Sequence, residues 1–146
     1  MDGSKYADQV FDWYVKYFYR ENDFVLIVYC SEHGALLTKP VPFNDPSFIS
    51  KLANEEEVEI VKLLKSYQAK LNDAKQEHAN LKGSVQRLSG RKPGQMIVEQ
   101  ASGQSIDLIL TGARGTSSLK TSLVGGVALY IMQNSRVPVL IVRHNE

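Results

Sequence analysis

Residues 108–132 read LILTGARGTSSLKTSLVGGVALYIM and contain the features that decide the fold. An apolar run is followed by two glycine pairs, Gly112 with Gly115 and Gly125 with Gly126. The apolar residues after the second pair have helical spacing. In open parallel sheets, ligands gather beyond the carboxyl ends of the strands, which is where this glycine-rich stretch begins. The stretch therefore predicts a buried strand, a helix and a candidate binding edge between them.

The rest of the chain alternates between helix and strand patterns. Helical spacing predicts helices over 4–20, 54–81 and 94–104, and β-rich runs predict strands over 23–30, 81–88, 106–111 and 137–143. Ser4 and Asn54 are the expected N-caps, and residues 31–53 are expected to form a long connection. This alternation predicts one α/β domain over residues 1–146, with an open, mostly parallel twisted sheet and helices on both faces.

Two of these segments carry further expectations. Residues 54–81 place one apolar stripe along the helix, and packing on a sheet explains this stripe better than a coiled coil does. Residues 81–88 alternate between apolar and polar side chains, which predicts an exposed strand near a sheet edge.

Composition narrows the classes of function. The 146 residues are 43% hydrophobic and 23% charged, with a net charge of +1 and no basic block, so we expect no nucleic-acid partner. Cys30 is the single cysteine, which excludes an internal disulfide, and its apolar surroundings indicate an inert, buried thiol. We see no signal-peptide pattern at the start, and no apolar run reaches the roughly 20 residues that span a bilayer. We therefore expect no membrane partner and a cytoplasmic location.

The glycine-rich stretch has the chemistry of a phosphate site. Glycines allow a close approach of the backbone, and the N–H groups at a helix start favour an anion. Arg114 and Lys120 are candidate charge partners, and the candidate hydroxyl donors are Thr116, Ser117, Ser118, Thr121 and Ser122. Neither the P-loop motif nor the dinucleotide-binding motif is present. From the pattern alone, a glycine-rich connector and a ligand site remain equally good interpretations.

The spacing G-x-x-G, nine residues, then G-G resembles the ATP-binding signature of the universal stress protein family. The similarity extends beyond the motif to DGSKYADQVFDWY near the start, to KPGQMIVEQASGQSIDLILTGARG, and to SRVPVLIVR near the end. It covers nearly the whole chain and is weakest over residues 31–53.

The resemblance implies a sheet of five parallel strands in the order 3-2-1-4-5, often in a homodimer that pairs the last strands, here residues 137–143. It implies binding of ATP, with Mg²⁺ as the accompanying metal, and a regulatory role in the stress response. The residues that it places around the nucleotide are Asp2 at the adenine or ribose, the backbone of Tyr29 at the adenine, and Gly112, Arg114, Gly115, Gly125 and the N–H groups of Gly126 and Val127 around the phosphates and ribose.

The sequence departs from the family pattern at two places. Gly126 stands where ATP-binding members have Ser or Thr, and the lost hydrogen bond to a charged group is worth roughly 1.5–3 kcal/mol, so we expect weakened binding. The family also has a central strand before the segment that starts here at Asp2. Either strands 23–30 and 106–111 close up directly, or another chain or segment lies between them, or the sequence lacks its first residues, and we favour the last.

Three functions follow from these patterns. The first is a nucleotide-binding regulatory protein, and the second is a nucleotide-independent dimeric scaffold or chaperone-like module. An ATPase ranks last because no general base can be placed: His33, His78 and His144 are isolated in the sequence, and no paired-carboxylate pattern is present. For the same reason we expect no catalytic residues, at most weak ATP hydrolysis and no metal site made of histidines.

Overall fold

The computed structural model describes residues 1–31, 46–114 and 124–143, and only the backbone of residues 46–54. The elements in chain order are α1 (Lys5–Trp13), the π-helical turn η1 (Tyr14–Phe18), β1 (Phe24–Ser31), α3 (Pro46–Glu77), β2 (Lys82–Ser89), α4 (Pro93–Gly103), β3 (Ile109–Gly112), α5 (Gly126–Asn134) and β4 (Val139–Val142). Helices and parallel strands alternate as predicted. Ser4 is the N-cap of α1, as expected, because its Oγ accepts a hydrogen bond of 3.2 Å from the Ala7 N–H.

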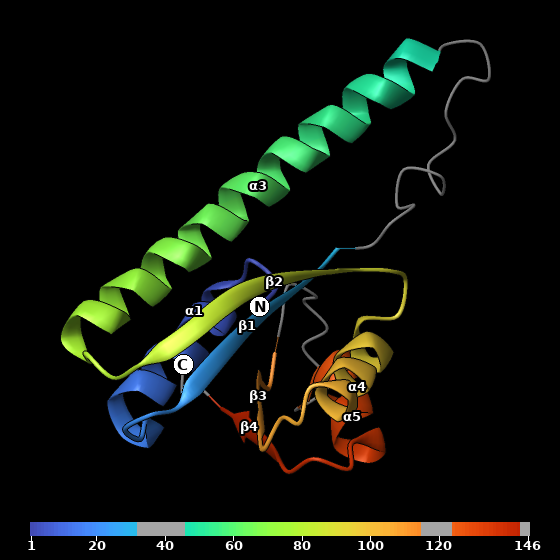
Figure 1. The fold of residues 1–146 in the computed structure, drawn as a ribbon. Coiled ribbons are helices and arrows are strands. Elements are labelled where there is room, and N and C mark those ends of the chain that lie inside the picture. Colours follow the sequence, from blue (N-terminus) through green and yellow to red (C-terminus); the bar gives the residue numbers. More distant parts are fainter. Residues whose placement is uncertain (32–45, 115–123, 144–146) are drawn as a thin grey trace.

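The strands form two parallel pairs. β1 pairs with β2 from Phe24 opposite Lys82, and β3 pairs with β4 from Ile109 opposite Val139. Within the described residues no strand joins β1 to β3, so the arrangement in which these two strands close up directly is wrong. The two pairs are visible separately in Figure 1. β2 is an outer strand, as its alternating pattern predicted.

Each strand pair has its own apolar core. The core against β1 and β2 combines side chains from α1, α3 and β1 with the residue before β2: Phe11, Ile27, Tyr67, Leu71, Ala74 and Leu81. The core against β3 combines α4 and α5: Ala101, Ile109 and Ile131. α1 also packs against β3, and α4 also packs against β1. These two helices therefore hold the strand pairs together.

α3 differs from its expected start. The helix begins at Pro46, so residues 46–53 are helical and Asn54 lies inside the helix instead of capping it. Proline is favourable in a first helical turn, where its missing N–H costs nothing, and this explains the earlier start. The other residues of the expected long connection, 32–45, lie outside the described part of the chain.

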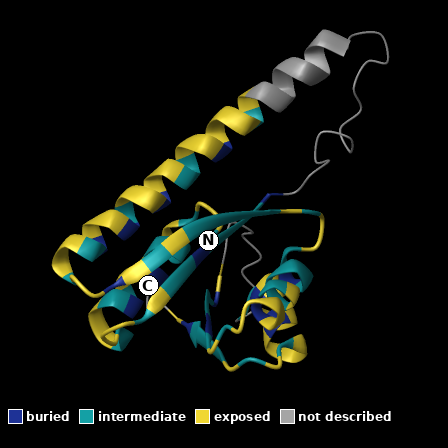
Figure 2. Cartoon of the chain, viewed as in Figure 1, coloured by how far each residue is buried: buried dark blue, intermediate teal, exposed yellow. Residues whose placement is uncertain are grey.

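The apolar stripe on α3 packs on the strands, as predicted. Ile60, Tyr67, Leu71 and Ala74 are buried, and the helix contacts β2 and β1. The opposite face of α3 is exposed along the described residues (Figure 2). None of the helices, as far as the structure describes them, is long and apolar enough to cross a membrane.

α4 and α5 approach each other closely at one glycine. Gly94 is buried in the first turn of α4. A Cβ placed there would lie 2.9 Å from Cδ1 and 3.1 Å from Cβ of Tyr130 on α5. Only glycine allows this approach without a shift of the ring.

Candidate nucleotide-binding site

The end of β3 turns closely against α1. A Cβ on Gly112 would lie 3.2 Å from the Arg114 carbonyl oxygen and 3.3 Å from Val10 Cγ2, so the missing side chain allows this packing. Gly112 does not use the left-handed backbone that glycine can adopt, because Gly3 is the only glycine in the described part of the chain with positive φ. Gly112 therefore serves the candidate site through close packing and not through backbone strain.

The start of α5 lies directly beside this turn. The Gly125 N–H donates a hydrogen bond of 2.6 Å to the Ala113 carbonyl oxygen. Gly125 is the N-cap residue and has no side chain with which to cap the helix. The N–H groups of Gly126 and Val127 belong to the first turn, where backbone donors lack partners in the helix and the helix dipole is positive. A Cβ on Gly126 would meet no atom of the described residues within 4 Å.

Asp2 belongs to a turn that is fixed from two sides. Its Oδ1 accepts hydrogen bonds from the Ser4 N–H at 3.0 Å and the Ser4 hydroxyl at 2.6 Å. The Gly3 N–H donates to the Tyr67 hydroxyl at 2.7 Å, and Gly3 has a φ of 81°, which favours glycine. The Met1 amino group donates to the Val28 carbonyl oxygen. α3 and β1 together hold the exposed Asp2 near the carboxyl end of β1.

Tyr29 lies in the same region and is half-buried. Burial raises the pKa of its hydroxyl above the ordinary value, while the charge of Arg87, opposite it on β2, acts in the other direction. Hydrogen bonds at the two ends of β1, from Lys82 N–H to the Asp23 carbonyl and from Gly90 N–H to the Ser31 carbonyl, show that odd-numbered residues face β2. The backbone of Tyr29 is therefore directed towards β2, and Cys30 is the neighbour whose backbone faces the opposite side.

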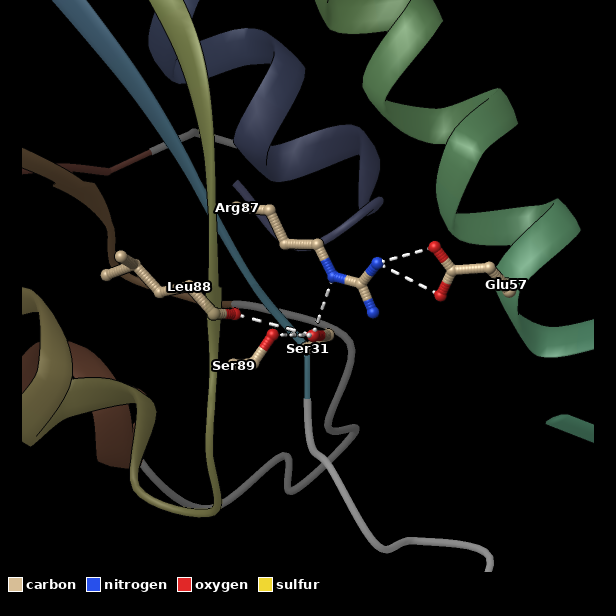
Figure 3. A network of polar contacts seen from close by, with 5 residues as sticks. All are labelled: Ser31, Glu57, Arg87, Leu88 and Ser89. Carbon is tan, nitrogen blue, oxygen red and sulfur yellow. Dashed lines mark hydrogen bonds and ion pairs between the residues drawn. The ribbon is translucent and has the colours of Figure 1, made fainter.

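A polar network lies at the carboxyl ends of β1 and β2 (Figure 3). Arg87 Nη1 donates to both carboxylate oxygens of Glu57 on α3, at 2.7 and 2.9 Å. Arg87 Nε donates to the Ser31 hydroxyl at 3.1 Å, and Ser31 Oγ lies 3.2 Å from Ser89 Oγ. Ser31 is only 3% exposed. The network ties both strand ends to α3.

Sequence reasoning missed this network because no motif marks its members. Arg87 and Glu57 are 30 positions apart. Their proximity depends on the register of β1 with β2 and on the placement of α3. The register places Tyr29 opposite Arg87, and a reliable strand pairing would have been the only signal.

The structure gathers the expected site residues into two groups. Gly112 and Arg114 lie beside Gly125, the N-cap of α5, whose first turn contains the other two expected residues, Gly126 and Val127. Asp2 and Tyr29 lie near the carboxyl end of β1. α1 connects the groups, because its residue Tyr6 has its carbonyl oxygen 3.9 Å from the Cβ position of Gly112.

Two further points concern the site's composition. Gly115, the remaining expected residue, lies outside the described part of the chain. The described residues contain no group of three or more His, Cys, Asp or Glu side chains that could hold a metal ion.

The fold and the glycine-rich turn beside the start of α5 define the class of protein. It is an α/β protein of parallel strands with helices on both faces. The sequence matches the family model described as "Universal stress protein family" over residues 1–143. The chain belongs to the universal stress protein family.

Individual relatives agree with this assignment. Universal stress protein YxiE of Bacillus subtilis is 32% identical over 97 residues, which cover 66% of this chain and 61% of the relative, so the chain spans less than two thirds of the relative's length. UspA from Lactobacillus plantarum has a similar fold, with a TM-score of 0.74, 21% identity and coverage of 98% and 93% of the two chains. A family protein from Arabidopsis thaliana, solved with AMP bound, has a TM-score of 0.64, 14% identity and coverage of 94% and 78%.

Proposed function

We propose that this chain is a regulatory protein of the stress response that binds ATP or a related adenine nucleotide, with Mg²⁺ accompanying the phosphates. The observation that carries the proposal is the open first turn of α5, which packs through Gly125 against the turn that follows Gly112. Backbone donors at a helix start, in reach of a close-packed glycine turn, suit a phosphate group. The AMP bound to the Arabidopsis relative supports an adenine nucleotide.

The proposed roles follow the two groups of residues. The N–H groups of Gly126 and Val127 bind phosphate, with the Arg114 guanidinium and Gly115 beside them. Asp2 and Tyr29 lie at the adenine and ribose end. The fixed Asp2 turn favours binding, because a carboxylate that is already oriented loses little entropy when the ligand arrives.

Calorimetry with ATP and Mg²⁺, and with AMP in a second titration, tests this function. Saturable binding is expected, and the double variant Gly125→Leu/Gly126→Leu should abolish it. The leucine at 126 fills the space beside the first turn of α5, and the one at 125 extends from a Cβ that already lies 3.5 Å from the Ala113 carbonyl oxygen. Gly103→Leu at the far end of α4 is the control for position 126, since a Cβ at either glycine meets no atom of the described residues within 4 Å. Absence of heat at millimolar nucleotide would contradict the proposal.

A nucleotide-independent scaffold is the second candidate. It is favoured by the missing hydroxyl at Gly126 and by the separation of β1 from β3. Under this alternative the double variant retains every partner interaction of the unmodified chain, whereas a nucleotide-dependent regulator loses them. We place hydrolysis of ATP at a weak level at most, which single-turnover assays would test.

We further propose a cytoplasmic homodimer formed through residues 137–143. β4 pairs with β3 alone among the described strands, so its other edge is available for pairing. Edge pairing of this kind uses backbone hydrogen bonds and demands no special side chains.

A further inference from the structure

The turn between β2 and α4 is cationic. Residues 78–98 contain Lys82, Arg87, Arg91 and Lys92 and no aspartate or glutamate. Arg91 and Lys92 are exposed, and the ion pairs of the described residues include neither of them. The turn therefore attracts a negatively charged group.

The start of α4 adds to this positive potential. Lys92 is the N-cap residue, its side chain makes no capping hydrogen bond, and the first turn contains no acidic residue. A cation is unfavourable at this end of a helix, where the dipole is positive. Gly90 packs on the same turn, since a Cβ there would lie 2.6 Å from Met96 Sδ. Ser89, the residue before Gly90, is therefore close to the positive end of α4.

Ser89 is an exposed serine among these charges. It is the last residue of β2 and pairs with Ser31, the last residue of β1. Its Oγ lies 3.2 Å from Ser31 Oγ, which is the one hydrogen bond of its side chain among the described residues. The end of an outer strand opens at a small cost in free energy, so the hydroxyl of Ser89 is accessible to another protein.

Two groups beside Ser89 can bind a phosphate. Ser31 is only 3% exposed, and its Oγ accepts a hydrogen bond of 3.1 Å from Arg87 Nε. In Figure 3 Arg87 Nη1 binds both carboxylate oxygens of Glu57, whereas the other terminal nitrogen makes no hydrogen bond to the residues drawn. A phosphoryl group on Ser89 has three acceptor oxygens, within reach of the Ser31 hydroxyl and the Arg87 guanidinium.

Glu57 is the present partner of Arg87 and would compete with this phosphate. The Glu57 side chain is 52% exposed and the Arg87 side chain is 23% exposed, so the pair contributes little free energy. A phosphoserine carries about −1.5 to −2 charges at neutral pH, more than a carboxylate does. The guanidinium therefore moves towards Ser89, and the attachment of α3 through Glu57 weakens.

We propose that Ser89 is a phosphorylation site. Its phosphate is bound by the Ser31 hydroxyl and the Arg87 guanidinium, which loosens the contact of Arg87 with Glu57 on α3. The phosphoryl donor is ATP, held by a protein kinase whose acidic substrate groove fits the basic residues around Ser89.

The transfer balances as an ordinary phosphoryl transfer. Ser89 Oγ forms a bond to the γ-phosphorus, and the bond between that phosphorus and the bridging oxygen breaks, so that ADP leaves. The hydroxyl proton passes to a base of the kinase. The modification is separate from the proposed nucleotide site, since it uses the end of β2 and not the first turn of α5.

Phosphorylation of the full chain tests access to Ser89. The kinase is one that phosphorylates the synthetic peptide 84–95, and the modified positions are located by mass spectrometry of fragments. We expect Ser89 to be modified about tenfold or more faster than Ser102, an exposed serine with no arginine or lysine in residues 93–113. The Gly125→Leu/Gly126→Leu variant should be modified equally well, which separates this result from nucleotide binding. Phosphate on the peptide but not on Ser89 of the chain would overturn the proposal.

Phosphoserine incorporated in place of Ser89 tests the contacts of the phosphate. Cationic and hydroxyl donors favour the dianion, so the second pKa of the phosphate, ordinarily about 6, should be lowered in a phosphorus NMR titration. Phosphoserine in place of Ser102 is the control and should keep the ordinary pKa. Arg87→Gln and Ser31→Ala should each raise the pKa at 89 towards the control, and Arg87→Lys should raise it less. Equal pKa values at 89 and 102, or no effect of Arg87→Gln, would overturn the proposal.

Amide exchange tests the effect on α3. We expect faster exchange in residues 55–60 when phosphoserine replaces Ser89, and no change when it replaces Ser102. In the Glu57→Gln variant the phosphate should have little further effect, because the ion pair with Arg87 is already lost. Unchanged exchange in residues 55–60 of the chain with phosphoserine at 89 would show that the phosphate does not displace Glu57, and the proposal would then be wrong.

Discussion

At the scale of single residues, the proposed affinity for a nucleotide depends most on Gly126. It keeps the backbone N–H at the first turn of α5 and supplies no hydroxyl. Its φ is not positive, because Gly3 alone has that property among the described glycines, so other residues fit this backbone. No atom of the described residues lies within 4 Å of its Cβ position. Nothing in the described surroundings therefore prevents a serine side chain there.

Gly126→Ser should raise the affinity for ATP. A hydrogen bond to a charged group is worth about 1.5 kcal/mol or more, so we expect the dissociation constant to fall about tenfold. Calorimetry measures it. Gly103→Ser is the control, because it adds the same hydroxyl at another open position, and it should leave the affinity unchanged. An unchanged affinity of Gly126→Ser would place the phosphates away from this turn.

Tyr67→Phe should weaken both the fold and the nucleotide site. It removes the hydroxyl that accepts the Gly3 N–H, which costs about 1 kcal/mol of unfolding free energy, and it releases the turn that holds Asp2. Urea unfolding and ATP calorimetry measure the two effects. A loss of stability with unchanged affinity would show that the Asp2 turn does not contact the ligand.

The same tyrosine predicts a pH dependence. Burial raises the pKa of Tyr67 to about 12. An unfolded tyrosine has a pKa of about 10, so above that pH the unfolded chain loses its proton first and the free energy of unfolding falls as pH rises towards 12. Below that range the group has no effect. Tyr67→Phe should make this decrease in the free energy of unfolding shallower, as measured by urea unfolding followed by circular dichroism. Part of the decrease should remain in the variant, because burial also raises the pKa of Tyr14.

At the scale of elements, α3 shows which features the sequence could predict. Its buried stripe was predictable because Tyr67, Leu71 and Ala74 recur at helical spacing. Its start at Pro46 was not, because the asparagine and glutamates from Asn54 onward fit a helix start and a helix interior equally well. A local capping pattern carries no information about the helical turns that precede it.

The candidate site also has parts that the sequence could predict and parts that it could not. The glycine spacing identified Gly112 and Gly125, which local sequence encodes as a strand end and a helix start. The Arg87 network depends on strand register and on the long-range placement of α3, which no local pattern contains. Whether β1 and β3 pair directly was left open by the sequence, because the family pattern has a strand between them that no segment of the sequence supplied; the structure shows that they do not pair.

Glu57→Gln should loosen the attachment of α3 without unfolding the protein. Glu57 is 52% exposed and Arg87 is 23% exposed, and partly exposed ion pairs contribute about 0–1 kcal/mol. We expect faster amide exchange in residues 55–60 of α3 and a change in the free energy of unfolding below about 1 kcal/mol. Glu59→Gln is the control, because Glu59 pairs with Lys62 within the same helix. Equal exchange in the two variants would show that Arg87 does not anchor α3.

At the scale of the whole molecule, the outer edge of β4 is the proposed dimer contact. The hydrogen bonds of Ile109 and Ala113 go to Pro138 and Val142, so even-numbered residues of β4 face β3 and Ile141 faces outward. A proline at 141 therefore removes an outward N–H without breaking the ladder to β3.

Ile141→Pro should convert the proposed dimer to a monomer, measured by sedimentation velocity, with unchanged affinity for ATP. Val85→Pro on β2 is the matched control, because Lys82 N–H faces β1 and odd-numbered residues of β2 face outward at the opposite edge. It should leave the oligomeric state unchanged. A dimer that survives Ile141→Pro would require another contact surface.

The contact of Gly94 with Tyr130 links two parts of the molecule mechanically. The first turn of α4 rests against a ring of α5 with no side chain between them, so a tilt of α5 displaces α4. α5 begins at the proposed phosphate site, and α4 packs against β1 and shares a core with Ile109 of β3. We expect a ligand that orders the first turn of α5 to restrain α4 as well, and by thermodynamic reciprocity a restraint on α4 should change the affinity for that ligand.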